Sequence, residues 1–262
     1  NGKWLWAAAG TTWPAKSTDN LVLIKDMDSS EKECLLYIPQ YAEVYSVKIG
    51  VQRDATMQAL ENPFRHRVAI WGSSFTQGVS TSRPGMAYPL QFTRHTGVQM
   101  LPFGCAGNCK MQTYFADVLV DVDADAFVFD CFSNPDAALI KERLVPFIDR
   151  MVAAHPGKPL IFQQTIYRER RNFNQVNNQF EQDKIDMAAS IFKEIKSTKE
   201  GREKYKDVYL IGTNATPPEH ETSVDGTHPG DYGYYLWARS IEKPILKILS
   251  KYLIVSSIIS NH

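Results

Sequence analysis

The sequence lacks a long apolar run, and it has no excess of charge of either sign. No apolar stretch approaches the roughly 20 residues that a membrane-spanning helix needs, and the most apolar one, 252–260, is short. Lysine and arginine total 29, as do aspartate and glutamate, so the formal net charge is zero. Because nucleic-acid binding depends on a basic surface, this balance argues against a nucleic-acid partner.

Cysteine is also scarce. The four cysteines (Cys34, Cys105, Cys109 and Cys131) are too few for a disulfide-stapled scaffold in a chain of 262 residues. Cys105 and Cys109 have the spacing of a metal-ligand pair, but no second Cys or His pair completes a set of four ligands. We therefore favour buried or free thiols over a zinc site.

Residues 1–62 have a different sequence pattern from the rest of the chain. Short apolar or alternating runs at 21–24, 34–38 and 44–51 are separated by turn-forming residues, which predicts antiparallel strands. A set of only a few strands is rarely stable by itself. We therefore expect these strands to pack on the following domain or to complete a sheet. The chain opens at Asn1 with neither an initiator Met nor a signal-like segment, so we expect a processed or truncated product.

From residue 66 the chain alternates between strand and helix patterns. Helices are predicted between and after five apolar runs. The runs are 67–72, 98–103, 126–131, 159–163 and 207–212, and the helices 111–120, 136–154, 174–199 and 232–252. Because the runs are continuous rather than alternating, we expect strands buried on both faces. Strands that alternate with helices predict an α/β fold with a parallel sheet covered on both sides, whose chemistry lies at the carboxyl ends of the strands.

A Gly-Ser-Ser-Phe-Thr-Gln-Gly turn follows the first run, at 72–78. Small residues there allow a tight turn that exposes the hydroxyl of Ser74. The turn is neither a phosphate-binding loop nor the G-x-S-x-G elbow of the α/β-hydrolases, because Thr76 stands where the second Gly belongs. Alone it is weak evidence for catalysis and more typical of ordinary turn chemistry.

Three further positions have both a chemical and a structural interpretation. Asp225 precedes His228 by three residues, so it can hold the imidazole while the other ring nitrogen accepts a proton from a serine; the alternative is a helix cap. Asn134, after the third run, can donate its amide to an oxyanion or cap a helix. Gly107, after the second run, can bring a backbone N–H close to a ligand or form a turn.

Together these positions resemble the four blocks of the SGNH (GDSL-type) hydrolase family, named for its Ser, Gly, Asn and His. The first block, Gly-Asp-Ser-x-Thr-x-Gly, is matched with Ser73 in place of the Asp. The segments 82–89 (Ser-Arg-Pro-Gly-Met-Ala-Tyr-Pro) and 130–131 (Asp-Cys) are similar to a branch of bacterial exported esterases. In that branch a β-sandwich module precedes the hydrolase domain.

The resemblance implies a three-layer α/β/α, flavodoxin-like sandwich with a five-stranded parallel sheet over residues 63–262. Residues 1–62 would be the C-terminal portion of the β-sandwich module. It also implies a carboxylic ester hydrolase without a metal or organic cofactor. Its catalytic residues would be Ser74, Asp225 and His228, and its oxyanion hole would comprise Ser74, Gly107 and Asn134.

Short acyl esters, with acetyl groups on carbohydrate favoured, are the substrates that the resemblance implies, on a small molecule or an oligosaccharide. A periplasmic or extracellular location is implied as well. The alternatives are a lysophospholipase or thioesterase, and a non-catalytic carbohydrate-binding protein with the same fold. The loop 167–173 carries three arginines, for which a solvated face is favoured over contact with an anionic or sugar-rich substrate.

Overall fold

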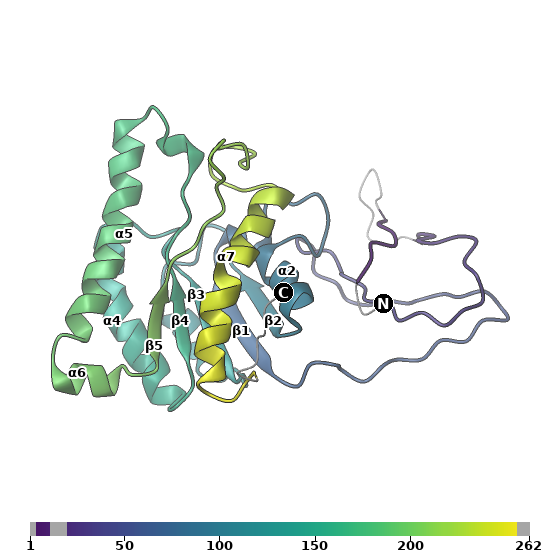
Figure 1. Ribbon diagram of the computed structural model, residues 1–262, viewed down its shortest axis with the longest axis horizontal. Coiled ribbons are helices and arrows are strands. Elements are labelled where there is room, and N and C mark those ends of the chain that lie inside the picture. The colour runs from purple at the N-terminus through teal and green to yellow at the C-terminus, as the bar shows by residue number, and fades with distance from the viewer. Residues whose placement is uncertain (1–3, 11–19, 256–262) are drawn as a thin grey trace. The chain divides into compact units, whose positions relative to one another are not determined.

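The structure is a computed structural model of the chain, and it describes residues 4–10 and 20–255 (Figure 1). The chain divides into two units, residues 1–38 and 39–262. Among the described residues before Arg67 there is no helix or strand, so the antiparallel strands expected there are not confirmed. Apolar side chains such as Val22 and Tyr45 are exposed. The β-sandwich segment and the domain boundary between residues 62 and 63 therefore stay predictions.

The second unit contains a five-stranded, all-parallel sheet, as predicted. Its strands are β1 (Arg67–Gly72), β2 (Gln99–Gly104), β3 (Ala126–Asp130), β4 (Leu160–Gln163) and β5 (Val208–Ile211). They lie in the order β2-β1-β3-β4-β5. Gly72 at the end of β1 is paired with both Gly104 of β2 and Asp130 of β3. The loops that follow these three strands therefore start at one edge of the sheet, where the strand order reverses and open α/β sheets bind ligands.

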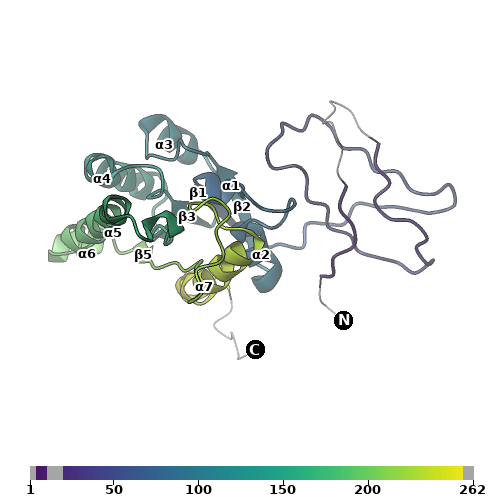
Figure 2. The same ribbon diagram turned by 90° about the horizontal axis from the view of Figure 1, so that it is seen from above.

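Helices cover both faces of the sheet. They are α1 (Ser74–Gln77), α2 (Tyr88–Thr96), α3 (Thr113–Leu119), α4 (Ala137–Ala154), α5 (Gln175–Ile195), α6 (Lys199–Lys204) and α7 (Asp231–Ser250), with a 3-10 turn, η1 (Glu169–Arg171). Helices α2 and α7 pack against each other on one face of the sheet, and α3, α4 and α5 lie on the other face (Figures 1 and 2). The predicted three-layer α/β/α sandwich is thus confirmed.

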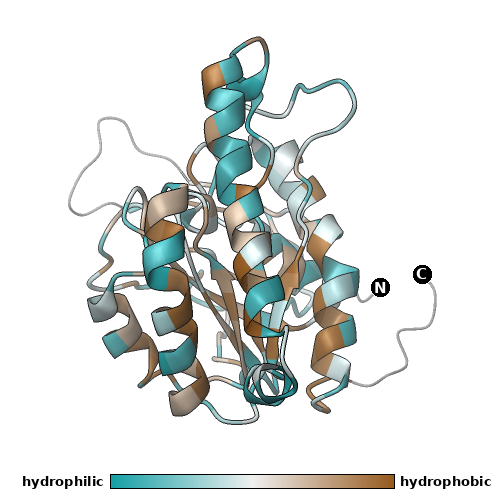
Figure 3. Cartoon of the chain, turned by 90° about the vertical axis from the view of Figure 1, so that its left-hand side faces the viewer, coloured by the Kyte–Doolittle hydropathy of each residue, from teal (hydrophilic) through white to brown (hydrophobic). Residues whose placement is uncertain are grey.

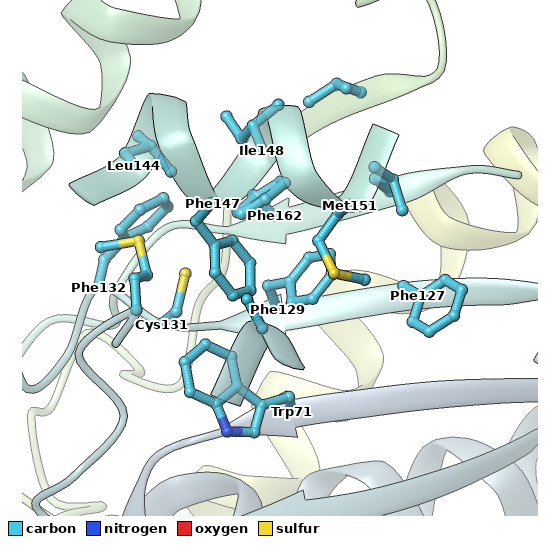
Figure 4. Close-up of a cluster of buried hydrophobic side chains, with 14 of the residues drawn as sticks. Trp71, Phe127, Phe129, Cys131, Phe132, Leu144, Phe147, Ile148, Met151 and Phe162 are labelled. Atoms are coloured by element: carbon cyan, nitrogen blue, oxygen red, sulfur yellow. The ribbon is translucent and has the colours of Figure 1, made fainter. Parts of the chain in front are cut away.

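The core consists of two apolar layers separated by the sheet. Alternate side chains of β1 enter different layers, so Ile70 packs in the layer of α7 while Trp71 packs in the layer of α4. Trp71 stacks on Phe147 with ring centroids 5.4 Å apart, and Phe129 stacks on Phe162 at 4.6 Å (Figure 4). The helices turn their apolar stripes toward the sheet and their polar faces outward (Figure 3). Buried aromatic pairs of this kind give the carboxyl edge of the sheet a rigid base.

Strand β2 departs from the prediction that all five strands are buried on both faces. It lies at the edge of the sheet, and Leu101 and Phe103 are 38% and 44% exposed. Pro102, which has no N–H to donate, is tolerated in such an edge strand. In residues 4–10 and 20–255, no helix is long and apolar enough to cross a bilayer.

Candidate active site

Ser74 is the first residue of α1 and is 8% exposed. The preceding residue, Ser73, caps the helix, with its Oγ accepting the N–H of Phe75 at 3.2 Å. Gly72 is required at the end of β1 because a Cβ there would lie 2.0 Å from the Oγ1 of Thr76. The sharp passage from strand to helix therefore presents the Ser74 hydroxyl at the carboxyl edge of the sheet.

The far end of α1 is held by the segment before the sheet. Gly78 ends the helix in a left-handed conformation, with φ of 90°. Its carbonyl oxygen accepts hydrogen bonds from Gln40 Nε2 at 2.7 Å and from the hydroxyl of Tyr41 at 2.6 Å. These two contacts could not be predicted from a local sequence pattern, because almost 40 residues separate the partners.

Ser74, His228 and Asp225 form a continuous chain of contacts. The Oγ of Ser74 lies 2.9 Å from Nε2 of His228, and Nδ1 of the same ring lies 2.7 Å from Oδ2 of Asp225. The other carboxylate oxygen, Oδ1, accepts the backbone N–H groups of Thr227 and His228 at 2.8 and 2.7 Å. Helix α7 begins at Asp231 with no side-chain cap, so Asp225 does not cap this helix, and its carboxylate contacts the imidazole instead.

The environment of Asp225 keeps its carboxylate ionised. Partial burial raises the pKa of this group, but the N–H of His228, its ring and the N–H of Thr227 outweigh that effect and lower the pKa to about 2. The loop is closed by a hydrogen bond of 2.9 Å from Val224 N to the carbonyl of His228. On the other side of the imidazole, the edge of the Phe75 ring packs with centroids 5.4 Å apart. The ring of His228 is thereby fixed in position.

Asn134 follows β3 and is half-buried. Its Oδ1 accepts the N–H of Cys109 at 3.1 Å, which fixes the orientation of the amide. Within the described parts of the chain, its Nδ2 has no hydrogen-bond partner. Helix α4 is capped instead by Asp136, whose Oδ1 accepts the N–H of Leu139 at 2.8 Å. The capping alternative for Asn134 is therefore wrong.

Gly107 lies in an exposed turn after β2, with φ of +72°. A Cβ at this position would meet nothing within 4 Å, so the backbone conformation rather than space favours glycine. The turn is closed by a hydrogen bond of 3.0 Å from Asn108 N to the carbonyl of Cys105. No hydrogen bond joins Gly107 to Ser74 or Asn134 in the described structure. The hydrogen bond between this loop and Asn134 is donated by the backbone N–H of Cys109.

Asp130, at the end of β3, is a buried carboxylate for which the sequence pattern predicts no role. It is 1% exposed. Its Oδ2 accepts the hydroxyls of Ser73 at 2.9 Å and Thr76 at 3.1 Å, and its Oδ1 accepts the hydroxyl of Ser133 at 3.2 Å. Burial raises the pKa of Asp130 to about 6, although the hydrogen bonds oppose this shift. This carboxylate ties the turn that carries Ser74 to the residue before Asn134.

The polar network continues from Asp130 into the core. Thr76 Oγ1 lies 2.9 Å from the hydroxyl of Tyr88, which accepts from Gln163 Nε2 at 3.4 Å. The Oε1 of Gln163 accepts the indole N–H of Trp237 at 2.8 Å. Gln163 is fully buried. It therefore satisfies buried polar groups of the core.

The arginines of the loop 167–173 differ in exposure. Arg168 and Arg171 are each 9% exposed, so the prediction of a solvated face is wrong for both. Arg171 binds polar side chains of α5. Arg170 is exposed, and its backbone N–H donates to the carbonyl of Gly226 at 2.9 Å, which attaches this loop to the turn that carries His228.

The cysteines are free thiols. Cys109 and Cys131 are buried, Cys105 is half-buried and Cys34 is exposed. Burial raises the pKa values of Cys109 and Cys131 well above the ordinary range. The thiolate is the nucleophilic form of cysteine. Because a raised pKa keeps both groups protonated, these two side chains are inert packing groups.

Residues 65–247 match the GDSL-like lipase/acylhydrolase family, and residues 1–57 match the N-terminus of the SGNH-hydrolase-type esterases. A Bacteroides ovatus protein described as a GDSL-like lipase is 38% identical, with a TM-score of 0.77, over 82% of this chain and 62% of its own. No curated protein matches the chain.

More distant structures share the fold alone. A salicylyl-acyltransferase from a tetracycline biosynthetic pathway is 18% identical, with a TM-score of 0.55, over 70% of this chain and 55% of its own. A family two carbohydrate esterase from Cellvibrio japonicus is 14% identical, with a TM-score of 0.52, over 74% and 64%. This chain thus spans less than two thirds of each of these chains. With the family matched over residues 65–247, the chain belongs to the GDSL-like lipase/acylhydrolase family.

Proposed function

We propose that the chain hydrolyses acyl esters with Ser74 as nucleophile, His228 as general base and acid, and Asp225 as the group that orients and stabilises the imidazole. The observation that carries this proposal is the 2.9 Å approach of Ser74 Oγ to His228 Nε2, continued at 2.7 Å from Nδ1 to Asp225. A nucleophile within hydrogen-bond reach of a base that a third group orients is the arrangement that activates a serine.

The reaction has two stages. Ser74 Oγ attacks the ester carbonyl carbon as its proton passes to His228 Nε2, and the resulting tetrahedral oxyanion collapses to an acyl-serine. The leaving alcohol takes the proton from His228. Water then attacks the acyl-serine, again giving its proton to His228, and the collapse of the second oxyanion releases the acid and restores the Ser74 hydroxyl.

The oxyanion is stabilised, in this proposal, by three N–H donors: the backbone N–H groups of Ser74 and Gly107 and the Nδ2 group of Asn134. Support comes from the fixed orientation of the Asn134 amide, whose Oδ1 already accepts from Cys109. The positive φ of Gly107 supports its assignment, since glycine lets the backbone approach a ligand closely. Donors held in advance cost no reorganisation during the reaction.

The proposed substrates are short acyl esters, and acetyl esters of carbohydrates are the favoured class. The resemblance to the esterase branch supports this choice, and an exported location belongs to the same proposal. Initial rates with p-nitrophenyl acetate, p-nitrophenyl octanoate and a panel of acetylated oligosaccharides test it. The proposal expects hydrolysis mainly of the acetyl compounds, and its loss in Ser74→Ala. Preference for octanoate would indicate a lipid-directed acylhydrolase, and no hydrolysis of any ester would indicate a non-catalytic protein; either result contradicts the proposal.

A further inference from the structure

Three charged side chains are buried together beside the candidate active site. Arg168 follows β4, while Glu181 and Lys184 lie on α5 (Figure 1), and their exposed fractions are 9%, 3% and 1%. Arg168 Nη1 donates to Glu181 Oε1 at 3.0 Å, and Lys184 Nζ lies 2.6 Å from Glu181 Oε2. One carboxylate between two cations leaves a net positive charge. Burying such charges is costly, so the arrangement requires an explanation beyond helix packing.

Both cations reach the same acceptor. Arg168 Nη2 donates to the carbonyl oxygen of Ser133 at 2.6 Å, and Lys184 Nζ donates to the same oxygen at 3.2 Å. This carbonyl belongs to the peptide group that joins Ser133 to Asn134. The Ser133 hydroxyl is held as well, 3.0 Å from Thr165 Oγ1. The peptide group before Asn134 is thus held by hydrogen bonds from both Arg168 and Lys184.

Arg168 also contacts the turn of the nucleophile. Its guanidinium carbon lies 5.5 Å from the ring centroid of Phe75, the residue after Ser74. The same ring packs against His228. The cluster therefore contacts the residues that adjoin the nucleophile, the base and the amide donor, although no step of the proposed reaction uses it.

We propose that Arg168 and Lys184, paired through Glu181, are positioning residues for the oxyanion donor Asn134. This inference rests on the proposed function. The two cations hold the Ser133 carbonyl, and with it the direction in which the Asn134 amide points. Because an oxyanion exists only during the reaction, the cluster acts on kcat rather than on KM.

A double-mutant cycle between Lys184→Met and Asn134→Ala tests the inference. Lys184→Met keeps a long side chain and removes the charge and the donor. It should lower kcat for p-nitrophenyl acetate about tenfold, with KM changed by less than about threefold. In the Asn134→Ala background the same substitution should change kcat by less than about twofold, because the donor through which it acts is already absent.

Lys196→Met is the matched control. Lys196 is another partly buried lysine that donates to a backbone carbonyl, that of Val208. Because Val208 is the first residue of β5 and the site lies at the carboxyl ends of the strands, loss of Lys196 should leave kcat within about twofold of wild type. If Lys184→Met does not fold, as judged by urea denaturation, Arg168→Lys replaces it. That variant keeps the charge but loses the two-pronged contact, and it should lower kcat severalfold only where Asn134 is present.

Two outcomes contradict the inference. Equal fold losses in kcat with and without Asn134 would show that the cluster supports folding alone, and a rise in KM at constant kcat would assign it to substrate binding. Wild type and Ser74→Ala are measured in the same assay. Absence of Ser74-dependent hydrolysis in the wild type overturns the proposed function and the inference together, whereas normal wild-type turnover confines a failure to the cluster.

Discussion

The hydroxyl of Ser73 donates a hydrogen bond of 2.9 Å to the carboxylate of Asp130. The first block of the SGNH family has an Asp at the position of Ser73. In this chain a carboxylate still lies against the nucleophile turn, but it comes from the end of β3. Because Asp130 also accepts from Ser133, one buried group connects the turn of Ser74 to the segment of Asn134.

Restoring the family residue with Ser73→Asp should destabilise the protein. The new carboxylate would replace a donor and lie beside Asp130 in a site that water does not reach, so one charge would be unpaired. We expect the free energy of unfolding at pH 7 to fall by about 3 to 5 kcal/mol, measured by urea denaturation. The same change in an Asp130→Asn background should recover most of the loss. A Ser73→Asp protein as stable as wild type would contradict this account.

Asp130 should make stability pH-dependent in mildly acidic solution. Its pKa in the folded chain is raised from 3.8 to about 6, so the folded state binds this proton more tightly than the unfolded state. The resulting stabilisation is fully present below about pH 4 and is lost as the pH rises through about 6. Between pH 4 and 6 the free energy of unfolding of the wild type should fall by about 2 kcal/mol relative to Asp130→Asn. Parallel pH curves for the two proteins would be the contrary result.

Asn134→Ala should lower kcat by about 10² to 10³ with KM nearly unchanged, since one oxyanion donor is lost. Steady-state kinetics with p-nitrophenyl acetate measure both constants. Asn108→Ala is the matched control, because Asn108 is an exposed asparagine of the neighbouring loop and its loss should leave kcat at the wild-type value. Wild-type turnover in Asn134→Ala would show that the assignment of this donor is wrong.

Asp225→Asn should lower kcat by about 10⁴ with little change in KM. An amide NH₂ facing Nδ1 of His228 favours the tautomer that carries its proton on Nε2, which cannot accept the proton of Ser74. Asp186→Asn, on an exposed part of α5, serves as the control. A decrease of less than tenfold in Asp225→Asn would assign Asp225 a minor role.

The sheet and the residues that follow its strands can be predicted from the sequence because a buried strand is a short continuous apolar run. The run at 67–72 coincides with β1, and that at 126–131 differs from β3 by one residue. Parallel strands bring their carboxyl ends together. Ser74 and His228 therefore meet although 154 positions separate them.

Other features depend on contacts that a local pattern does not contain. Helix α2 (Tyr88–Thr96) has few apolar residues in a helical period, and its burial against α7 emerges only in the fold. Arg168 and Glu181 are of residue types that are usually exposed, so their burial could not be anticipated. The apolar runs before residue 62 predict strands, but a strand also needs a paired neighbour.

Covalent labelling tests the central claim most directly, namely that Ser74 is a nucleophile activated by His228. The protein is incubated with a fluorophosphonate probe and digested, and the modified peptide is sequenced by mass spectrometry. The account predicts a single adduct on Ser74, no labelling in Ser74→Ala, and full labelling in the control Ser190→Ala, which changes an exposed serine of α5. An adduct on another residue, or labelling that persists in Ser74→Ala, would contradict it.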